Sequence, residues 1–343
     1  MIDDKKRKQL FWQVSFLLAL IVGTVYIVRH QQVMPYQHNH GFVFGTVYNI
    51  TYQSDQNLQN EIIAQLNKVD ASLSTFNKNS IISKVNTNKD VTVDEMFKEV
   101  FEQAQQISAE TGGAFDITVA PMVNLWGFGF KNNIHPSRSA IDSLRAIVGY
   151  NKVKLVANQV KKQDRRIMLD CSAIAKGYGC DIVARYLHSK DIKNFMIEIG
   201  GEVLTSGISE KRLPWKIGVT KPIDDTTHID QELQTVLNIT DKAMATSGNY
   251  RNFYYKGGKK YAHTIDPKTG RPVQHSLLSA TVLATNCATA DAYATAFMVM
   301  GMEKAKQVLQ KHPELMAYFI YTDTKGNNAV WYSPSMNGKL IGN

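Results

Sequence analysis

The sequence predicts an α+β fold: a largely antiparallel sheet with flanking helices. Helical periodicity dominates the first half of the chain, whereas residues 195–283 consist mostly of short strand-like segments. Short turns join several of these segments, and strands joined by tight turns pair antiparallel. Helices mixed with consecutive hairpins are typical of the α+β class.

The N-terminal segment predicts a membrane anchor. Leu10–Val28 carries no charged residue, and at about 1.5 Å per residue it just spans a hydrocarbon core. The basic run Lys5–Lys8 precedes it, so the positive-inside rule keeps this end cytoplasmic and exports the rest. No A-x-A-like cleavage site ends the apolar run, which favours an uncleaved signal anchor. The expected organisation is a cytoplasmic basic segment at 1–9, a transmembrane signal anchor at 10–28, a polar tether at 29–41, one folded domain at 42–333 and a C-terminal tail at 334–343.

The first part of the folded domain predicts one strand and two long helices. Phe42–Tyr52 alternates as a strand does, and a helix is expected over Leu58–Leu73. A second helix, Glu95–Thr111, begins with the capping-box pattern Thr92–Glu95. Its apolar residues recur at helical spacing. They are Met96, Val100, Ala104 and Ile107.

The middle of the chain predicts shorter elements before a third long helix. Two short helices are expected around Thr118–Leu125 and Ile141–Ile147, followed by short strands at Val153–Val156 and Ile167–Leu169. Ser172 can cap a helix over about residues 174–190.

The second half predicts mainly strands. Lys256–Lys259 reads as a tight hairpin turn, and the polar stretch 222–232 reads as an exposed loop. Helices at Thr289–Met300 and Glu303–Lys311 precede two final strands around Asp323–Gly326. The other expected strands are Phe195–Ile199, Val203–Gly207, Trp215–Thr220, Thr235–Ile239, Ala243–Thr246, Arg251–Tyr255, Lys260–Ile265 and Leu278–Leu283.

Composition indicates an ordinary folded protein, with 44% hydrophobic and 20% charged residues. The formal net charge of +9 comes from scattered lysines and arginines without a basic stripe interleaved with aromatics, so nucleic acid is not the expected partner. An anionic dinucleotide or an anionic membrane surface accounts for this excess. Cys171, Cys180 and Cys287 show no metal-ligand spacing and are expected to be small buried residues.

Asp291 and Thr295 are the first candidates for chemistry. Four positions apart on a helix, they lie on one face. A carboxylate and a hydroxyl are hard oxygen ligands of the kind that Mg²⁺ favours, although the same pair also suits a solvated helix face.

Three upstream segments have the same character. Lys176 lies in the first turn of a helix, where the dipole disfavours a cation, so a bound phosphate or carboxylate would explain it better than helix propensity. A plain surface lysine is the alternative. Gly112–Asp116 allows close backbone approach, and Glu198–Glu202 is a hairpin turn that needs no ligand.

Eight short strings carry a family resemblance in order along residues 42–333. They are Phe44–Tyr48, Leu73–Phe76, Gly112–Asp116 leading into Pro121–Gly127, Asp170–Gly177, Glu198–Glu202, Ala245–Gly248, His263–Gly270 and Ala290–Thr295. Together they resemble the ApbE family of flavin transferases, which are FAD:protein FMN transferases with a T-fold-like domain. The resemblance implies transfer of FMN from FAD to a Thr or Ser hydroxyl of an acceptor flavoprotein, with release of AMP.

The resemblance also implies a site. Its cation, Mg²⁺ or Mn²⁺, would be held by Asp291, Thr295 and the backbone carbonyl of Ala173. His263 is the candidate general base, and Asp266 would orient its ring or merely cap the following turn. The FAD-binding candidates are Phe44, Phe76, Ala114, Phe115, Asp116, Asp170, Lys176 and Ile265.

The expected location is the bacterial inner membrane, single-pass, with the domain on the periplasmic side and acceptor subunits of membrane redox complexes as partners. Family members often carry a lipid-bearing Cys after the apolar run, and this chain has none there. Two other functions stay open: a metal-dependent FAD pyrophosphatase that yields FMN and AMP, and a flavin-binding protein without turnover. The presence of Asp291, Thr295 and His263 disfavours the last.

Overall fold

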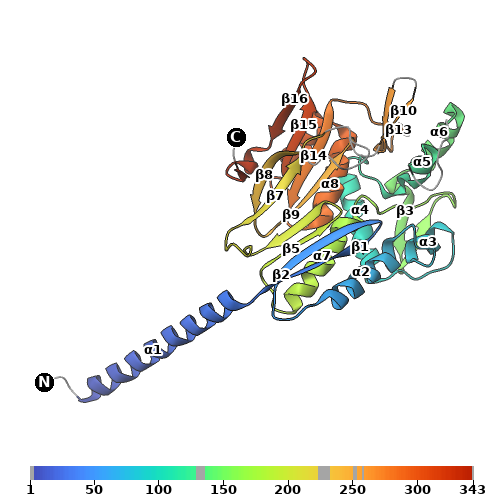
Figure 1. Cartoon of the computed structure of the whole chain (residues 1–343). Coiled ribbons are helices and arrows are strands. Elements are labelled where there is room, and N and C mark those ends of the chain that lie inside the picture. The colour runs from blue at the N-terminus through green and yellow to red at the C-terminus, as the bar shows by residue number, and fades with distance from the viewer. Residues whose placement is uncertain (1–3, 129–135, 223–231, 250–252, 257–258, 342–343) are drawn as a thin grey trace.

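The computed structural model describes residues 4–128, 136–222, 232–249, 253–256 and 259–341. A long helix, α1 (Asp4–Val33), stands clear of a folded domain that contains all the other elements (Figure 1).

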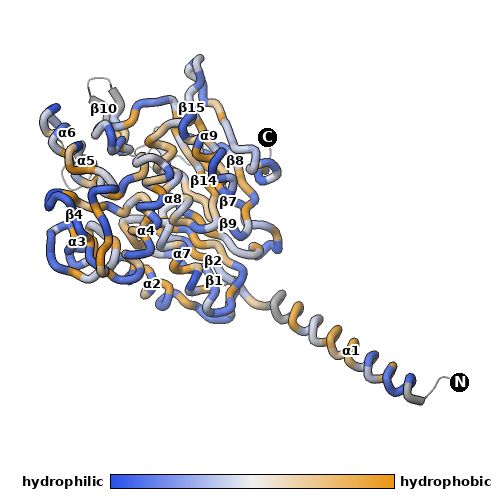
Figure 2. The backbone as a smooth tube through the Cα atoms, turned by 180° about the vertical axis from the view of Figure 1, so that it is seen from behind, coloured by the Kyte–Doolittle hydropathy of each residue, from blue (hydrophilic) through white to orange (hydrophobic). Residues whose placement is uncertain are grey.

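Helix α1 is long and apolar enough to cross a membrane over Lys6–Arg29, and none of that stretch is buried against the domain. Figure 2 shows apolar turns along most of α1 and polar residues near its N-terminal end. A signal sequence has the same length and composition, so the helix fits either an anchor or a signal sequence.

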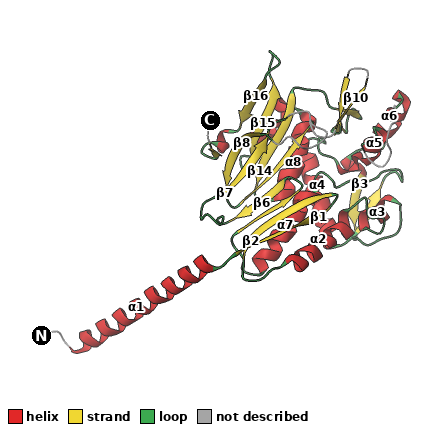
Figure 3. Cartoon of the chain, viewed as in Figure 1, coloured by secondary structure: helices red, strands yellow, loops and turns green. Residues whose placement is uncertain are grey.

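An eight-stranded sheet forms the centre of the domain (Figure 3). The strand order is β1-β2-β5-β6-β9-β14-β15-β16, and every neighbouring pair is antiparallel. The predicted antiparallel α+β class is therefore confirmed. The strands are β1 (Tyr36–Val43), β2 (Thr46–Gln53), β5 (Phe195–Ile199), β6 (Glu202–Ser206), β9 (Lys242–Gly248), β14 (Leu277–Ala284), β15 (Met316–Thr322) and β16 (Asn328–Tyr332).

Helices cover one face of this sheet. α7 (Ala175–Ser189) packs on β5 and β6, and α8 (Cys287–Met300) packs on β9 and β14. α2 (Gln59–Leu73) lies against α7, and α4 (Glu95–Glu110) lies against α8. The remaining helices are α3 (Ile81–Asn86), α5 (Ala120–Leu125), α6 (Arg138–Arg145), α9 (Met302–Lys311) and the 3-10 turns η1 (Ile117–Val119), η2 (Tyr150–Lys152) and η3 (Pro334–Met336).

A small second sheet covers the other face, in the order β17-β8-β7. Side chains alternate between the two faces because the strand repeat is two residues. Ala243 and Ala245 of β9 therefore belong to the helix-side core, whereas Met244 packs with Trp215 and Leu237 of the second sheet. The strands of this second sheet are β7 (Trp215–Thr220), β8 (Leu233–Ile239) and β17 (Leu340–Ile341).

Three short hairpins complete the fold. β10 (Phe253–Lys256) pairs with β11 (Lys259–Ala262), as the predicted hairpin requires, although its tip at 257–258 lies outside the described residues. The start of the predicted strand at 251–252 and most of the predicted loop at 222–232 also lie outside them. The other two hairpins are β3 (Val153–Val156) with β4 (Gln159–Lys162), and β12 (Ile265–Asp266) with β13 (Arg271–Pro272).

The predicted tether and tail are wrong for the residues nearest the domain. Residues 36–41 belong to β1, which pairs with β2 along its whole length. The single strand expected at 42–52 therefore covers the end of β1, the turn at 44–45 and most of β2. In the tail, Met336 is buried and β17 pairs with β8. Polar composition at 29–41 concealed β1, because an edge strand exposes many of its side chains.

Three local predictions are also corrected. Asp94, rather than Thr92, caps α4 by accepting a hydrogen bond from the Phe97 backbone N–H. Ser172 does not cap α7, because its hydroxyl donates to Asp170 instead. Ile167 and Leu169 are buried, but residues 167–169 form no strand. The Asn86 side chain bonds both the N–H and the carbonyl of Leu169.

Helices α7 and α8 exchange hydrogen bonds at their N-termini. Asp181 of α7 accepts from the backbone N–H groups of Cys287 (2.7 Å) and Ala288 (2.9 Å) at the start of α8. Asp291 of α8 accepts from the N–H of Gly177 in α7 (3.1 Å). The helices approach so closely that a Cβ on Gly177 would lie 2.3 Å from the Cys287 carbonyl oxygen, and glycine is therefore required there.

The raised pKa of the buried Asp181 carboxyl makes the free energy of unfolding depend on pH. Burial raises the pKa of this carboxyl to about 6 from an ordinary 3.8, against the opposing effect of its two backbone hydrogen bonds. The folded protein thus binds this proton more tightly than the unfolded chain, and the stabilisation is lost as pH rises through the folded pKa. Relative to Asp181→Asn, the wild-type free energy of unfolding should be greater at about pH 4.5 than at about pH 7, by about 2 kcal/mol.

Urea unfolding of the full chain in detergent at the two pH values measures this difference. Asn286→Ala is the control. It removes the N-cap of α8, the helix whose first N–H groups Asp181 accepts, without removing a titrating group. Its offset from wild type should be the same at both pH values. A pH-independent offset for Asp181→Asn would contradict the prediction.

Candidate functional site

A cavity of about 430 Å³ lies where the N-terminal part of α7 faces α8. The turn between β5 and β6, the end of β9 and the segment 263–267 form further walls, together with residues 114–124. Elements from distant parts of the chain therefore meet at one opening.

Eleven of the thirteen residues predicted from the sequence line this cavity. They are Phe76, Ala114, Phe115, Asp116, Asp170, Ala173, Lys176, His263, Ile265, Asp291 and Thr295. Because these residues come from five separate segments, their convergence is a property of the tertiary structure.

Phe44 and Asp266 lie outside the residues that line the cavity. Phe44 occupies the β1–β2 turn with φ +52°, and its ring packs against Gly179 of α7. Asp266 accepts a hydrogen bond from the Lys268 backbone N–H (2.8 Å), which is the turn-capping alternative considered above.

Lys176 lies between two buried carboxylates. Its ammonium is 2.9 Å from Glu202 Oε1 and 3.9 Å from Asp291 Oδ2. The two carboxylate side chains are 5% and 3% exposed, whereas that of Lys176 is 28% exposed. The expectation that a phosphate or a carboxylate partner accounts for Lys176 is therefore confirmed for the carboxylate, because Glu202 and Asp291 lie beside its ammonium.

One ammonium does not compensate two carboxylates. Burial raises the pKa of Glu202 to about 7, although Lys176 acts in the opposite direction. Burial likewise raises the pKa of Asp291. Burial alone would lower the pKa of Lys176, but the two carboxylates outweigh it and raise that pKa. A cation or a proton at this wall of the cavity would relieve the excess negative charge.

Three oxygen donors for a cation line the cavity together. Asp291 and Thr295 lie one turn apart on α8, and Ala173 precedes α7. The Thr295 hydroxyl is 3.1 Å from that of Ser247 on β9. In the described part of the chain no group of three or more His, Cys, Asp or Glu residues is placed to hold a metal. This donor set contains a single carboxylate, so it fits a hard cation that also takes oxygens from a bound phosphate.

The two other predicted carboxylates shape loops of the cavity wall. Asp116 accepts from the backbone N–H and hydroxyl of Thr118 and from the Tyr150 N–H. Burial raises its pKa, although these hydrogen bonds act against the shift. Asp170 accepts both the N–H and the hydroxyl of Ser172 through Oδ1. Both side chains are thus fixed before any ligand enters.

The remaining walls supply an aromatic and a titratable group. Phe76 is 75% exposed, an unusual position for a large apolar side chain at the edge of a cavity. The His263 ring also lines the cavity and lies 6.4 Å from that of Phe128, edge to face.

Glu202 is the site residue that the sequence reasoning missed. It directly follows Gly200-Gly201. Because a Gly-Gly hairpin turn needs no ligand, sequence reasoning did not assign Glu202 to a site. The available signal was the acidic residue at the start of an apolar strand, where a charged side chain directed inward needs a partner.

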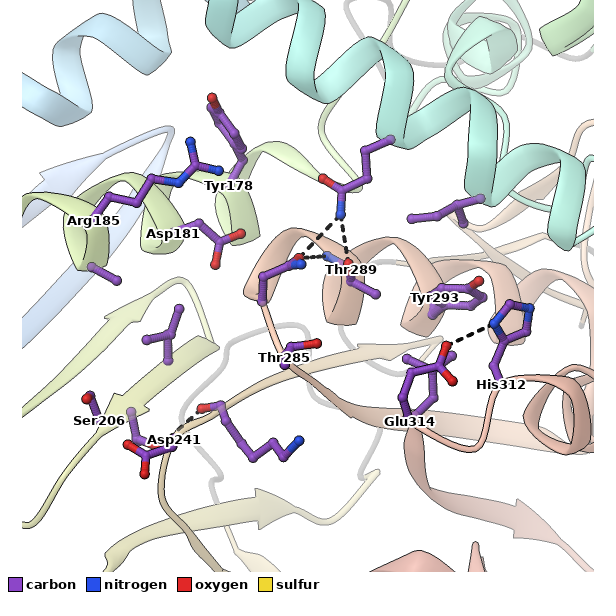
Figure 4. A pocket seen from close by; sticks show the side chains of 18 of the residues that line it. Tyr178, Asp181, Arg185, Ser206, Asp241, Thr285, Thr289, Tyr293, His312 and Glu314 are labelled. Carbon is purple, nitrogen blue, oxygen red and sulfur yellow. Dashed lines mark hydrogen bonds and ion pairs between the residues drawn. The ribbon is translucent and has the colours of Figure 1, made fainter. Parts of the chain in front are cut away.

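A second cavity, of about 880 Å³, lies between α4, α7 and the start of α8 (Figure 4). None of the predicted site residues lines it, and several of its polar side chains already have hydrogen-bond partners in the protein. Asp181 accepts from the backbone of α8, Arg185 bonds Glu99 (2.7 Å), Tyr293 bonds Glu110, and His312 bonds Glu314 (3.0 Å). We therefore take the smaller cavity as the candidate functional site.

Comparison with known proteins identifies the family. The model of the ApbE family matches residues 44–319, which is most of the chain. The chain belongs to the ApbE family.

The ApbE relatives match nearly the whole domain. An FAD:protein FMN transferase of Vibrio cholerae is 37% identical over 297 residues, covering 83% of this chain and 88% of the relative. The FAD:protein FMN transferase of Escherichia coli K12 is 34% identical, covering 83% and 82%. The solved flavin transferase ApbE from Vibrio cholerae has a TM-score of 0.80 at 34% identity, covering 90% and 100%. The apo flavinyl transferase ApbE from Pseudomonas stutzeri has a TM-score of 0.79 at 27% identity, covering 90% and 97%.

The two glycines of the β5–β6 turn differ in what an added side chain would meet, so their substitution should affect ligand binding differently. Gly200 has φ +62°, and a Cβ there would lie 2.7 Å from Thr46 Cγ2 and 3.3 Å from Lys176 Cδ. Gly200→Ala should therefore displace Lys176 as well as strain the turn. We expect about a tenfold weaker affinity for FAD, measured by flavin fluorescence.

Gly201→Ala is the matched control, since Gly201 has φ +98° but nothing within 4 Å of its Cβ position. It should lower the free energy of unfolding by about 1–2 kcal/mol through backbone strain and leave FAD affinity within about twofold of wild type. Equal losses of affinity in both variants would contradict the assignment.

Proposed function

We propose that this protein transfers FMN from FAD to a Thr or Ser hydroxyl of an acceptor flavoprotein, in a Mg²⁺-dependent reaction that releases AMP. Membership of the ApbE family and relatives that are FAD:protein FMN transferases make the chain an enzyme of this class, with FAD as flavin donor. One structural observation supports the finer proposal: three oxygen donors, a lysine and a histidine line a single cavity.

The FAD-binding groups are assigned from the cavity wall. Phe76 and Phe115 offer aromatic surface to a flavin or adenine ring. Asp116 and Asp170 stand on hydrogen-bonded loops, so they are pre-positioned for polar contacts with a ligand. Ala114 and Ile265 add apolar wall, and Lys176 provides positive charge for the diphosphate. Phe44 is left out, because it packs against α7.

The cation site is assigned to Asp291, Thr295 and the Ala173 carbonyl. Their oxygens suit Mg²⁺, or Mn²⁺ in its place, and the excess of buried carboxylate charge favours a cation. Mg²⁺ bound there would act as a Lewis acid on the phosphate oxygens.

The transfer step needs a positioned nucleophile and charge neutralisation. The acceptor hydroxyl oxygen bonds to the FMN-side phosphorus, and the bond from that phosphorus to the bridging oxygen breaks, so that AMP leaves. His263 takes the hydroxyl proton as general base. Lys176 offsets charge on the diphosphate. Asp266 supports the following turn, because its carboxylate is bonded to the Lys268 backbone.

The site of action is proposed from α1. With the basic segment 1–9 in the cytoplasm and α1 in the inner membrane, the domain would face the periplasm. Acceptors would then be extracytoplasmic flavoproteins, including subunits of membrane redox complexes.

A product assay tests the proposal. The full chain in detergent is incubated with FAD, Mg²⁺ and a peptide that carries candidate Thr and Ser acceptors, and products are separated by mass spectrometry. We expect peptide bearing FMN together with AMP. Free FMN with AMP would indicate a pyrophosphatase, and unchanged FAD a binding protein; either result with a verified acceptor would overturn the proposal.

Asp291→Asn should lower the transfer rate by at least about 100-fold, because the cation loses its carboxylate ligand. Thr289→Ala is the matched control, since Thr289 lies two residues earlier on α8 and lines the other cavity. It should retain transfer within about threefold of wild type. Mg²⁺-dependent transfer retained by Asp291→Asn would remove the metal assignment.

His263→Gln should lower the transfer rate by about 100-fold to 10,000-fold, because proton removal from the acceptor is lost. FAD affinity should change little, and the slow residual rate should rise with pH as hydroxide replaces the base. Rate and FAD affinity are measured on the same preparation. A variant that transfers FMN at the wild-type rate would exclude His263 as the base.

A further inference from the structure

The ammonium of Lys176 is shared unequally between two carboxylates. It lies 2.9 Å from Glu202, a hydrogen-bonded ion pair, but 3.9 Å from Asp291. Asp291 Oδ2 instead accepts the Gly177 N–H at 3.1 Å. The lysine is thus held at Glu202 and only approaches Asp291.

Glu202 is rigidly placed for this contact. It is the first residue of β6 and pairs with Ile199 across the hairpin. Its side chain is 5% exposed and lines the cavity, and its second oxygen, Oε2, is buried without a hydrogen-bond partner among the described residues. An unsatisfied buried carboxylate oxygen is costly, so stability alone does not explain an acid at this position.

Removal of Glu202 would leave Asp291 as the remaining carboxylate beside Lys176. The ammonium would then close the 3.9 Å gap and occupy the carboxylate that a cation needs. Two positive charges cannot share one buried carboxylate without strong repulsion.

We propose that Glu202 is a positioning residue for the cation site: it retains Lys176 at its own carboxylate and thereby keeps Asp291 open to a divalent cation. This inference rests on the proposed function, because it takes Asp291 as a cation ligand. Lys176 then stays at the cavity wall, 28% exposed, where it can meet the diphosphate of FAD.

Direct Mn²⁺ binding to the full chain in detergent, without FAD, tests the inference by electron paramagnetic resonance. Four proteins form a cycle: wild type, Glu202→Gln, Lys176→Met and the double variant. Glu202→Gln should weaken Mn²⁺ binding about tenfold. This is the change expected when the Lys176 ammonium moves from 3.9 Å to hydrogen-bonding contact with the Asp291 carboxylate at an effective dielectric of about 20.

The cycle separates positioning from a direct effect of the Glu202 charge. In the Lys176→Met background, removal of Glu202 should weaken Mn²⁺ binding clearly less than in the protein that keeps Lys176, since only the direct attraction between the Glu202 charge and the cation is lost when no ammonium remains to be positioned. Equal losses in both backgrounds would mean that Glu202 acts on the cation itself, and no loss in either would mean that it has no influence. Both outcomes overturn the proposal.

Three further variants complete the design. Glu198→Gln removes the same charge from the same hairpin, away from Lys176, and should leave Mn²⁺ affinity unchanged. Glu202→Leu, which leaves no unpaired polar atom, replaces Glu202→Gln if that variant does not fold, with the same tenfold loss expected. Asp291→Asn should abolish Mn²⁺ binding; if it binds like wild type, the proposed cation site itself has failed, which is a result distinct from failure of the Glu202 cycle.

Discussion

Reciprocal hydrogen bonds from the backbone of α7 and α8 to an aspartate of the other helix hold the centre of this structure together. Asp181 of α7 accepts the first backbone N–H groups of α8, and Asp291 of α8 accepts an N–H in the first turn of α7. Each helix thus satisfies donors that the other cannot satisfy internally. The exchange requires close approach, which Gly177 permits because it has no side chain to meet the α8 backbone.

The same contact creates the site. Since Asp291 is drawn to the start of α7, it also comes within 3.9 Å of Lys176, one residue before Gly177. Glu202 reaches the lysine from the neighbouring hairpin. Two acids and one ammonium are therefore buried together at the wall of a cavity. This arrangement is electrostatically unsatisfied by itself and suited to a cation and an anionic dinucleotide.

The sequence predicted the fold class because its signals are local. Alternation along the strands, short turns between them and the amphipathic pattern of α4 each act over a few residues. The hairpins β1–β2, β5–β6 and β15–β16 of the central sheet pair antiparallel across such short turns. The errors have a shared cause. β1 is a largely exposed edge strand that pairs with β2 across a turn, and β17 is a two-residue strand that pairs with β8 far earlier in the chain, so the composition of each resembles a loop.

Residue chemistry, family resemblance and the i, i+4 spacing of Asp291 and Thr295 were determined by the sequence alone, because they depend on side-chain type and on the helical repeat. Only the tertiary structure decided which groups face one another. In that structure Phe44 packs against α7, Asp266 accepts a hydrogen bond within its own turn, and Glu202 forms an ion pair with Lys176. The physical reason is that Coulomb and hydrogen-bond energies depend on distances of a few ångströms between segments far apart in the chain, and those distances are set by packing.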